Sequence, residues 1–385
     1  MKLSIHRQAL SDVLSLATGL VPTRSPKPVL SSVRLSTASL PSGRVLQIVC
    51  TDGDMTLETY LPQVDIKQDG ALLLPASKFA DIVNNSPDET ISISSSGEKA
   101  TITGRDSSYT LLGFGGEGYP PIEAFEGKID LSIEAGRFKS MLDCTRFAAA
   151  KEMTRYAING VLFEAKGKKL SLVATDGHRM AHVREDINGG DDAQAAESRD
   201  ISAVVPIKAI GHIEKLLSDP DAVIAMQFRE NKIFIQVMAA DTDSGRRSVR
   251  ATFSSTLVEG VFPPYQDVIP KDCDRKASIS SAPFSSSVRR ASVMTSDDSR
   301  AIKVSFTNNQ LDLIGRSPEL GEARITMPIE YTGPATELGF NPNYLLDAVK
   351  VAPTDNFTFE FKASGPALMR FGKAFMYVIM PVTIP

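Results

Sequence analysis

Two similar stretches of sequence decide the fold of this chain: LQIVCTDGDMTL at Leu46–Leu57 and LSLVATDGHRMA at Leu170–Ala181. In each, an apolar run with β-branched residues precedes Thr-Asp-Gly. An aspartate can accept a hydrogen bond from the backbone two residues on, and a glycine tolerates the positive φ that a tight turn needs. Each stretch therefore predicts a strand that runs into a hairpin turn, and the recurrence indicates an internal repeat.

Other landmarks recur around these turns in the same order. The start of a strand at Leu3-Ser-Ile5 recurs as Leu131-Ser-Ile133 and, more faintly, as Ala277-Ser-Ile279. A second helix is expected after Leu74-Pro75, after Val205-Pro206 and from Phe340-Asn-Pro342 onward, and the third copy has Gly315-Arg-Ser317 in place of Thr-Asp-Gly. The sequence thus predicts three tandem copies of a unit with the order helix, strands, helix, strands, as domains 1–127, 128–273 and 274–385.

Apolar residues at helical spacing predict the first helix of each copy. The first is expected over Arg7–Val21 and the second over Ala135–Ala150. A turn is predicted at Pro41-Ser-Gly43, and the polar stretch Asn188–Asp200 is interpreted as a surface insertion.

Composition is that of a soluble globular protein, with 385 residues, 42% hydrophobic and 23% charged. A net charge of −4 argues against a protein that coats nucleic acid with its whole surface, although a local basic face remains compatible with it. Cys50, Cys144 and Cys273 are far apart, which favours reduced thiols in the cytosol. No run of about 18 apolar residues occurs, so a membrane span is not expected.

Catalytic and cofactor motifs are scarce. His178 and His182 are four residues apart, but they follow a strand and a turn, where that spacing does not bring them together on one metal. The glycine-rich Gly113–Gly118 is followed by Tyr119-Pro-Pro121 and not by the helix that a phosphate-binding loop requires. Asp52, Asp54 and Asp176 are best interpreted as turn-capping residues. We expect no catalytic residue, no metal and no cofactor.

Basic residues recur on the predicted helices and in the segments next to them. Two interpretations carry equal weight from the residues alone, namely solvated helix faces or one positive face that attracts a phosphate backbone without recognising bases. The candidate DNA-facing residues are Arg24, Lys78, Arg137, Lys139, Arg146, Lys151, Lys208, Lys215, Arg289 and Lys350.

These features coincide with one family. The sequence resembles the bacterial sliding clamps, the beta subunits of the DNA polymerase III holoenzyme, along its whole length. The residues that carry the resemblance are Val173-Ala-Thr-Asp-Gly-His-Arg179, Arg155-Tyr-Ala-Ile-Asn-Gly160 with Leu162-Phe-Glu164, Phe262-Pro-Pro-Tyr265, Gly339-Phe-Asn-Pro-Asn-Tyr344 and Tyr377-Val-Ile-Met-Pro381.

The resemblance implies an α+β fold in which two chains form a closed ring, with helices lining the hole and sheets outside. It implies a cytoplasmic, non-enzymatic homodimer that encircles duplex DNA without regard to sequence. The implied partners are the DNA polymerase III alpha subunit, an ATP-driven clamp loader, and other replication and repair polymerases.

The resemblance also implies a hydrophobic partner-peptide pocket between the second and third copies. Its residues by motif are Arg155, Ile158, Thr175, Gly177, His178, Arg179, Met180, Pro263, Val268, Val378, Ile379, Met380, Pro381 and Val382. The implied dimer contacts are Tyr109 and Leu111 of one chain with Val293 and Met294 of the other.

The chain departs from the family pattern at three places. Ala157 stands where tyrosine is common, Asp267 stands where a basic residue is common, and the tail reads Val382-Thr-Ile-Pro385. These departures leave the preferred peptide open.

Two functions of other classes remain as alternatives. One is a hydrolase or transferase with its site at Asp176 and His178, which the lack of a nucleophile–base pair disfavours. The other is a peptide-binding scaffold unrelated to DNA, which predicts basic residues spread evenly over the surface.

Overall fold

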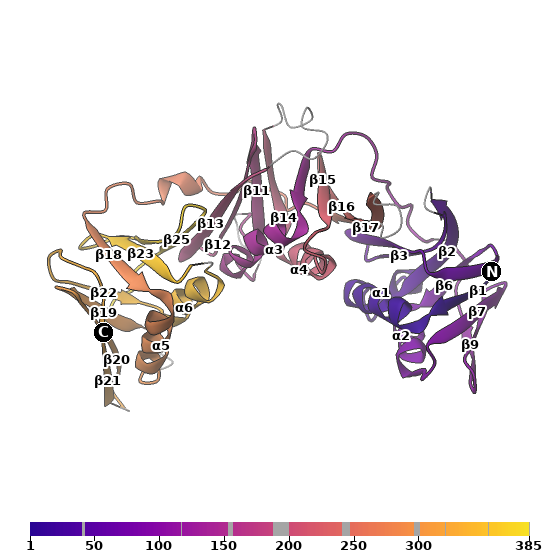
Figure 1. The fold of residues 1–385 in the computed structure, drawn as a ribbon, viewed down its shortest axis with the longest axis horizontal. Coiled ribbons are helices and arrows are strands. Elements are labelled where there is room, and N and C mark those ends of the chain that lie inside the picture. The colour runs from indigo at the N-terminus through magenta and orange to yellow at the C-terminus, as the bar shows by residue number, and fades with distance from the viewer. Residues whose placement is uncertain are drawn as a thin grey trace. The chain divides into compact units, whose positions relative to one another are not determined.

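The structure is a computed structural model that describes residues 1–40, 43–116, 118–152, 157–187, 200–240, 247–295, 301–319, 321–352 and 354–384. Within these ranges the order of elements repeats three times along the chain (Figure 1). Each copy has a short strand, a helix, a run of strands, a second helix and three further strands. The predicted internal repeat is therefore confirmed.

The first copy comprises β1 (Lys2–His6), α1 (Arg7–Leu20), η1 (Pro28–Ser31), β2 (Ser32–Leu40), β3 (Gly43–Thr51), β4 (Met55–Leu61), β5 (Val64–Gln68), β6 (Ala71–Pro75), α2 (Ala76–Asn85), β7 (Thr90–Ser96), β8 (Lys99–Thr103) and β9 (Ser108–Leu112). The second comprises β10 (Leu131–Glu134), α3 (Ala135–Asp143), η2 (Arg146–Ala148), β11 (Gly160–Lys166), β12 (Lys169–Thr175), β13 (Arg179–Asp186), β14 (Ile201–Pro206), α4 (Ile207–Leu216), β15 (Val223–Arg229), β16 (Lys232–Ala240) and β17 (Arg247–Thr256). The second copy ends with η3 (Tyr265–Asp267). The third comprises β18 (Arg275–Ser280), α5 (Ser281–Ser292), β19 (Ile302–Thr307), β20 (Gln310–Ser317), β21 (Gly321–Pro328), β22 (Thr336–Phe340), α6 (Pro342–Val351), β23 (Asn356–Phe361), β24 (Ala367–Phe371) and β25 (Phe375–Ile379).

One predicted helix is shorter than expected. The helix predicted over 135–150 ends at Asp143, and a 3₁₀ turn follows at Arg146–Ala148. The Thr145 hydroxyl donates to Met141 O (2.9 Å), a side-chain bond that competes with continuation of the helix. The expected turn at Pro41-Ser42 and almost all of the loop predicted at 188–200 lie outside the described residues. No described helix is long and apolar enough to cross a membrane.

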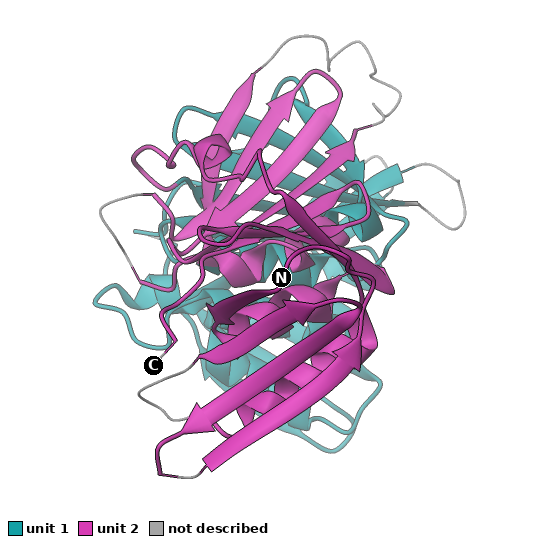
Figure 2. Cartoon of the chain, turned by 90° about the vertical axis from the view of Figure 1, so that its left-hand side faces the viewer, with its two compact units in different colours: residues 1–139, 188–197, 208–257 teal, residues 140–187, 198–207, 258–385 magenta. Residues whose placement is uncertain are grey.

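The strands form four antiparallel sheets, and two of these sheets extend from one copy into the next. One eight-stranded sheet has the order β10-β15-β16-β17-β4-β3-β2-β6, and the other has the order β14-β11-β12-β13-β25-β24-β23-β18. The outer copies each complete one sheet of their own, β5-β1-β7-β8-β9 in the first and β21-β20-β19-β22 in the third. The chain divides into two compact units, each of which contains one of the eight-stranded sheets (Figure 2).

Paired helices cover the sheets within each unit. α1 packs beside α2, and α5 packs beside α6 (Figure 1). Leu10 and Leu14 of α1 and Phe79 and Val83 of α2 are completely buried, as the apolar stripes of these helices require. Their opposite faces are polar and remain exposed.

The two Thr-Asp-Gly turns have the same hydrogen bonds. In the first, the Thr51 hydroxyl donates to Met55 O (2.7 Å), and Asp52 Oδ1 accepts from the amides of Asp54 (3.1 Å) and Met55 (2.8 Å). Gly53 has a φ of +105°. The second turn repeats this with Thr175 Oγ1 to Arg179 O (2.7 Å), Asp176 Oδ1 from the amides of His178 (3.0 Å) and Arg179 (3.1 Å), and Gly177 at a φ of +89°.

Each of these turns also holds the strand that crosses from the next copy. β4 pairs with β17, and the Thr256 amide donates to Asp54 O (2.9 Å) of the first turn. β13 pairs with β25, and the Met380 amide donates to His178 O (2.9 Å) of the second turn. Asp54 and His178 occupy the same turn position, so the two junctions between copies are built alike.

Replacing Gly53 by alanine should destabilise the chain by about 1–2 kcal/mol, because a Cβ at this φ is strained although it meets no neighbour within 4 Å. Gly211→Ala in the middle of α4 is the matched control. A Cβ at Gly211 also meets nothing within 4 Å, and the φ of this residue is not positive. The alanine variant should therefore raise the free energy of unfolding by about 0.5–1 kcal/mol. Denaturant midpoints of both variants measure these effects, and equal effects of the same sign would contradict this account of the turn.

Candidate partner-binding site

The candidate site lies at the second junction, where β13 pairs with β25. Beneath it is a hydrophobic cluster within one unit. Met180 and Val378 are directly paired across the two strands and each is 2% exposed, and Ile158 is 7% exposed. These predicted site residues, with the fully buried Ile379, therefore form a floor and not the exposed surface.

Above this floor the chain exposes apolar side chains. Val268 is 49%, Met380 41% and Val382 38% exposed. Gly177 and His178 of the turn are also exposed, while Thr175, Pro263 and Pro381 are half-buried. Arg155 lies outside the described residues. Exposed apolar groups over a buried hydrophobic core are suited to the anchors of a partner, because little further ordering is needed to bury them.

Arg179 joins the two copies beneath the surface. Its side chain is only 9% exposed. Nε donates to Asp176 Oδ2 (2.9 Å), Nη1 to Asp347 Oδ2 (2.6 Å) and Nη2 to Phe147 O (2.9 Å). The guanidinium also lies over the Tyr344 ring, 4.3 Å from its centroid. The planar guanidinium with its several donors thus fixes α6 of the third copy against the turn of the second.

The first junction uses a simpler ion pair. Lys208 of α4 contacts Asp52 of the first turn at 2.8 Å, and the lysine side chain is 64% exposed. Met55, at the position equivalent to Arg179, is buried in the core. The first junction therefore shares the turn and the strand pairing, but its described residues include neither a buried arginine like Arg179 nor an exposed apolar rim like that of the second.

A buried histidine, His182, lies on β13 two residues after Met180 of the floor. His182 on β13 is 3% exposed, and neither ring nitrogen has a hydrogen-bond partner among the described residues. Its ring contacts Tyr265 edge-on with 5.4 Å between centroids, and the Tyr265 hydroxyl donates to Glu164 Oε2 (2.6 Å). Burial, with a smaller effect of Arg184, lowers the pKa of His182 from 6.5 to about 4.

The three departures from the family pattern have distinct surroundings. Ala157 is buried in the floor cluster, 4% exposed. Asp267 is exposed at the end of η3, next to Val268. The tail crosses Gly339, where the Val382 amide donates to Gly339 O (2.9 Å), and a Cβ on Gly339 would approach Val382 O to 2.5 Å.

The candidate DNA-facing residues all lie on helices or directly after them. Apart from the half-buried Arg137, all of them are exposed. Some are already paired, in the contacts Lys78–Asp81 (3.6 Å), Arg146–Asp143 (3.9 Å) and Lys208–Asp52 (2.8 Å). Besides the half-buried Arg137, the other candidates are Arg24, Lys139, Lys151, Lys215, Arg289 and Lys350.

The candidate dimer residues lie at exposed edges. Tyr109 is on β9, the last strand of its sheet, and is 40% exposed. Val293, directly after α5, is 72% exposed, and Leu111 and Met294 are half-buried. Leu112, which the sequence analysis did not single out, is 70% exposed on the same edge strand.

Acid should weaken folding through His182. In the unfolded chain the His182 imidazole has its ordinary pKa of 6.5, and in the folded chain its pKa is about 4. Between these two values the unfolded state binds a proton that the folded state does not bind. The free energy of unfolding then falls by about 1.4 kcal/mol per pH unit between about pH 6 and pH 4.5. Chemical denaturation across this range should give a smaller pH slope for His182→Phe than for wild type. His6→Gln, which replaces an exposed histidine, is the control, and an unchanged slope in His182→Phe would contradict the assignment.

Comparison with known proteins agrees with this architecture. Family models match residues 1–123, 132–264 and 266–383, described as the N-terminal, central and C-terminal domains of the DNA polymerase III beta subunit. The beta sliding clamps of Pseudomonas aeruginosa and Escherichia coli are 29% and 26% identical over the full length of both chains.

Solved structures give the same result. A crystal structure of the DNA polymerase III subunit beta from Pseudomonas aeruginosa superposes with a TM-score of 0.88 at 29% identity and full coverage of both chains. A sliding clamp from Bartonella birtlesii bound to griselimycin has a TM-score of 0.85 at 32% identity, again with full coverage of both chains. The chain belongs to the DNA polymerase III beta subunit family, the sliding clamps that act as non-catalytic processivity factors of the replicative polymerase.

Proposed function

We propose that two copies of this chain close head to tail into a ring around duplex DNA, and that the second junction of each copy tethers polymerases and the clamp loader. The observation that carries this proposal is the likeness of the two internal junctions. In both, the strand after the hairpin turn of one copy pairs with the last strand of the next copy.

Two strands of these kinds have no such partner within the chain, namely the strand after the turn of the third copy and the last strand of the first copy. β21 follows the turn of the third copy and is an edge strand, and β9 is the last strand of the first copy and is also an edge strand. Exposed edge strands are templates for pairing with another chain. Pairing of β21 with β9 of a second copy, and the reverse, would form two further junctions and leave no such edge open. The exposed Leu112 and Tyr109 lie on β9, as this pairing requires.

The exposed basic residues on helices support DNA binding by charge alone. Lys139, Arg289 and Lys350 lie on the first or second helix of their copies. Contacts to phosphates position a protein on DNA but carry no sequence information, so a ring that contacts DNA in this way is free to slide. The non-DNA scaffold remains the alternative, and it does not account for the unpaired β9 and β21 edges.

The partner site is proposed to hold a short peptide with apolar anchors over Val268, Met380 and Val382. Apolar anchors with a few polar contacts are a common mode of peptide recognition. The partners by family membership are the polymerase III alpha subunit, other replication and repair polymerases and the ATP-driven loader that opens the ring. The domain boundaries 1–127, 128–273 and 274–385 and a cytoplasmic location are part of this proposal.

Met380→Asp should weaken binding of the polymerase III alpha subunit by about tenfold or more, because a charge then faces the apolar anchors. Stimulation of DNA synthesis on a singly primed circle and direct binding of the alpha subunit measure this. The dimer should persist in light scattering. A variant that is monomeric, or that stimulates synthesis normally, would place partner binding elsewhere.

Leu112→Asp combined with Val293→Asp should convert the dimer into a monomer that still binds the alpha subunit, because the charges lie at the proposed ring-closing edges and not at the partner site. Size exclusion with light scattering gives the oligomeric state. Val261→Asp is the matched control, since Val261 is 83% exposed and lies on neither edge. A double variant that remains a dimer would refute the proposed closure.

A further inference from the structure

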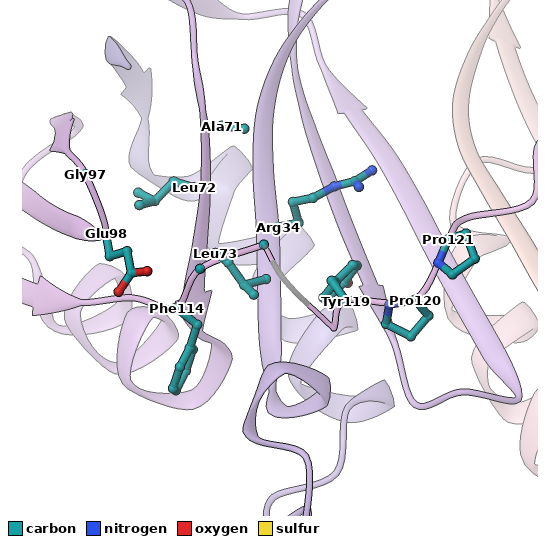
Figure 3. Close-up of a pocket in the computed structure, with 12 residues that line it drawn as sticks. Arg34, Ala71, Leu72, Leu73, Gly97, Glu98, Phe114, Tyr119, Pro120 and Pro121 are labelled. Atoms are coloured by element: carbon teal, nitrogen blue, oxygen red, sulfur yellow. The ribbon is translucent and has the colours of Figure 1, made fainter.

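A cavity of about 350 Å³ lies in the first copy, apart from the partner site (Figure 3). Its walls come from β2, from β6, from the turn between β7 and β8 and from the segment that follows β9. Backbone hydrogen bonds hold that segment in place, since the Gly113 amide donates to Glu98 O (2.7 Å) and the Phe114 amide donates to Leu73 O (2.9 Å). The segment after β9 is therefore hydrogen-bonded both to β6 and to the turn between β7 and β8, and these backbones bound the cavity.

Arg34 is the cation of this cavity. Its Nε is buried and has no hydrogen-bond partner among the described residues. Its guanidinium carbon lies 5.6 Å from the centroid of the Tyr119 ring, and the Tyr119 hydroxyl is used elsewhere, in a 3.2 Å bond to Val49 O. The guanidinium therefore brings a positive charge to the cavity wall, with which an anionic ligand group can pair.

The other side chains that line the cavity are mostly apolar, and one acidic side chain lies at its far end. Leu73 and Phe114 lie between Arg34 and Glu98, as Figure 3 shows. Pro120 and Pro121 line the side of Tyr119. Glu98 is exposed, and its carboxylate lies over Gly115, where a Cβ would approach Oε1 to 2.8 Å. A ligand therefore meets a positive end, an apolar middle and a negative end.

The strand β6 adds a backbone recognition element. It is the terminal strand of its eight-stranded sheet. The β2–β6 register pairs Ser36 with Ala71, and the Thr37 amide donates to Gly70 O (3.1 Å). This alternation directs the amide and carbonyl of Ala71 to the outer edge, beside the cavity, where an extended segment can add as a strand.

We propose that this cavity is a second peptide site, which binds a short extended segment with an acidic side chain between apolar residues. The acidic side chain pairs with Arg34, the apolar neighbours pack on Leu73, Phe114 and the proline wall, and the segment's backbone bonds to Ala71. A phosphate ligand fits less well, because a single guanidinium in apolar surroundings offers few donors to a multiply charged anion. The site does not depend on the proposed ring or on the partner site.

The test uses the full-length protein labelled with 3-fluorotyrosine and observed by fluorine NMR. Tyr119→Phe identifies the Tyr119 signal among the signals of the eight tyrosines. The probes are acetyl-Leu-Glu-Leu-amide, its glutamine counterpart acetyl-Leu-Gln-Leu-amide, and inorganic phosphate. The glutamate peptide should shift the Tyr119 signal with an affinity about tenfold higher than the glutamine peptide, because only the former pairs with the guanidinium.

Variants separate charge recognition from structural effects. Arg34→Met should reduce the affinity for the glutamate peptide to that of the glutamine peptide, and Arg34→Lys should retain part of it. Arg44→Met is the matched control, because Arg44 lies on β3 of the same sheet and is paired with Asp69 outside the cavity. Equal affinities for the two peptides, an unchanged affinity in Arg34→Met, or a Tyr119 shift with phosphate at the glutamate peptide's affinity would each overturn the proposal.

Discussion

The backbone pairing of strands from consecutive copies is the interaction on which the rest of this structure depends. β4 with β17 and β13 with β25 convert two four-stranded halves into an eight-stranded sheet at each junction. The Thr-Asp-Gly turn fixes the register, because its carbonyl accepts the amide directly beyond the paired strand, from Thr256 in one case and Met380 in the other. Since a one-residue slip would turn every side chain to the wrong face, this bond at the end of the ladder has consequences along the whole sheet.

Function follows from how the two junctions differ. At the first, Asp52 is held by the exposed Lys208, and Met55 fills the core. At the second, Arg179 joins both copies from within, and Met380 is left exposed above a buried hydrophobic floor. Apart from Val261, the large apolar side chains that are exposed in the described ranges fall at β9, after α5 and around the second junction. Those are the edges proposed to close the ring and the surface proposed to bind partners.

The sequence was sufficient to predict the features that depend on local pattern. The turns, the three copies and most helices follow from residue types at short spacing, and the family motifs located the second junction. The family resemblance placed Arg179 in the pocket wall. Its bond to Asp347 could not be predicted, because the two residues are 168 positions apart and no local pattern links them. β21 was missed because its inward face carries only Ala323, Ile325 and Met327, of which Met327 alone is buried. The apolar alternation of this strand is therefore weak. Helix α3 was predicted too long because the Thr145 side-chain bond is not visible in the periodicity.

Retention on DNA tests the central claim, which is that the free strands β9 and β21 of two copies close a ring. The protein is loaded onto a nicked circle of DNA by its clamp loader, and the loader is then removed. The amount of protein bound to the DNA is measured before and after the circle is cut once. One dimer should stay on the intact circle and should leave as soon as the circle is cut, because the attachment is topological. Equal loss from circular and linear DNA, or retention after cutting, would contradict it.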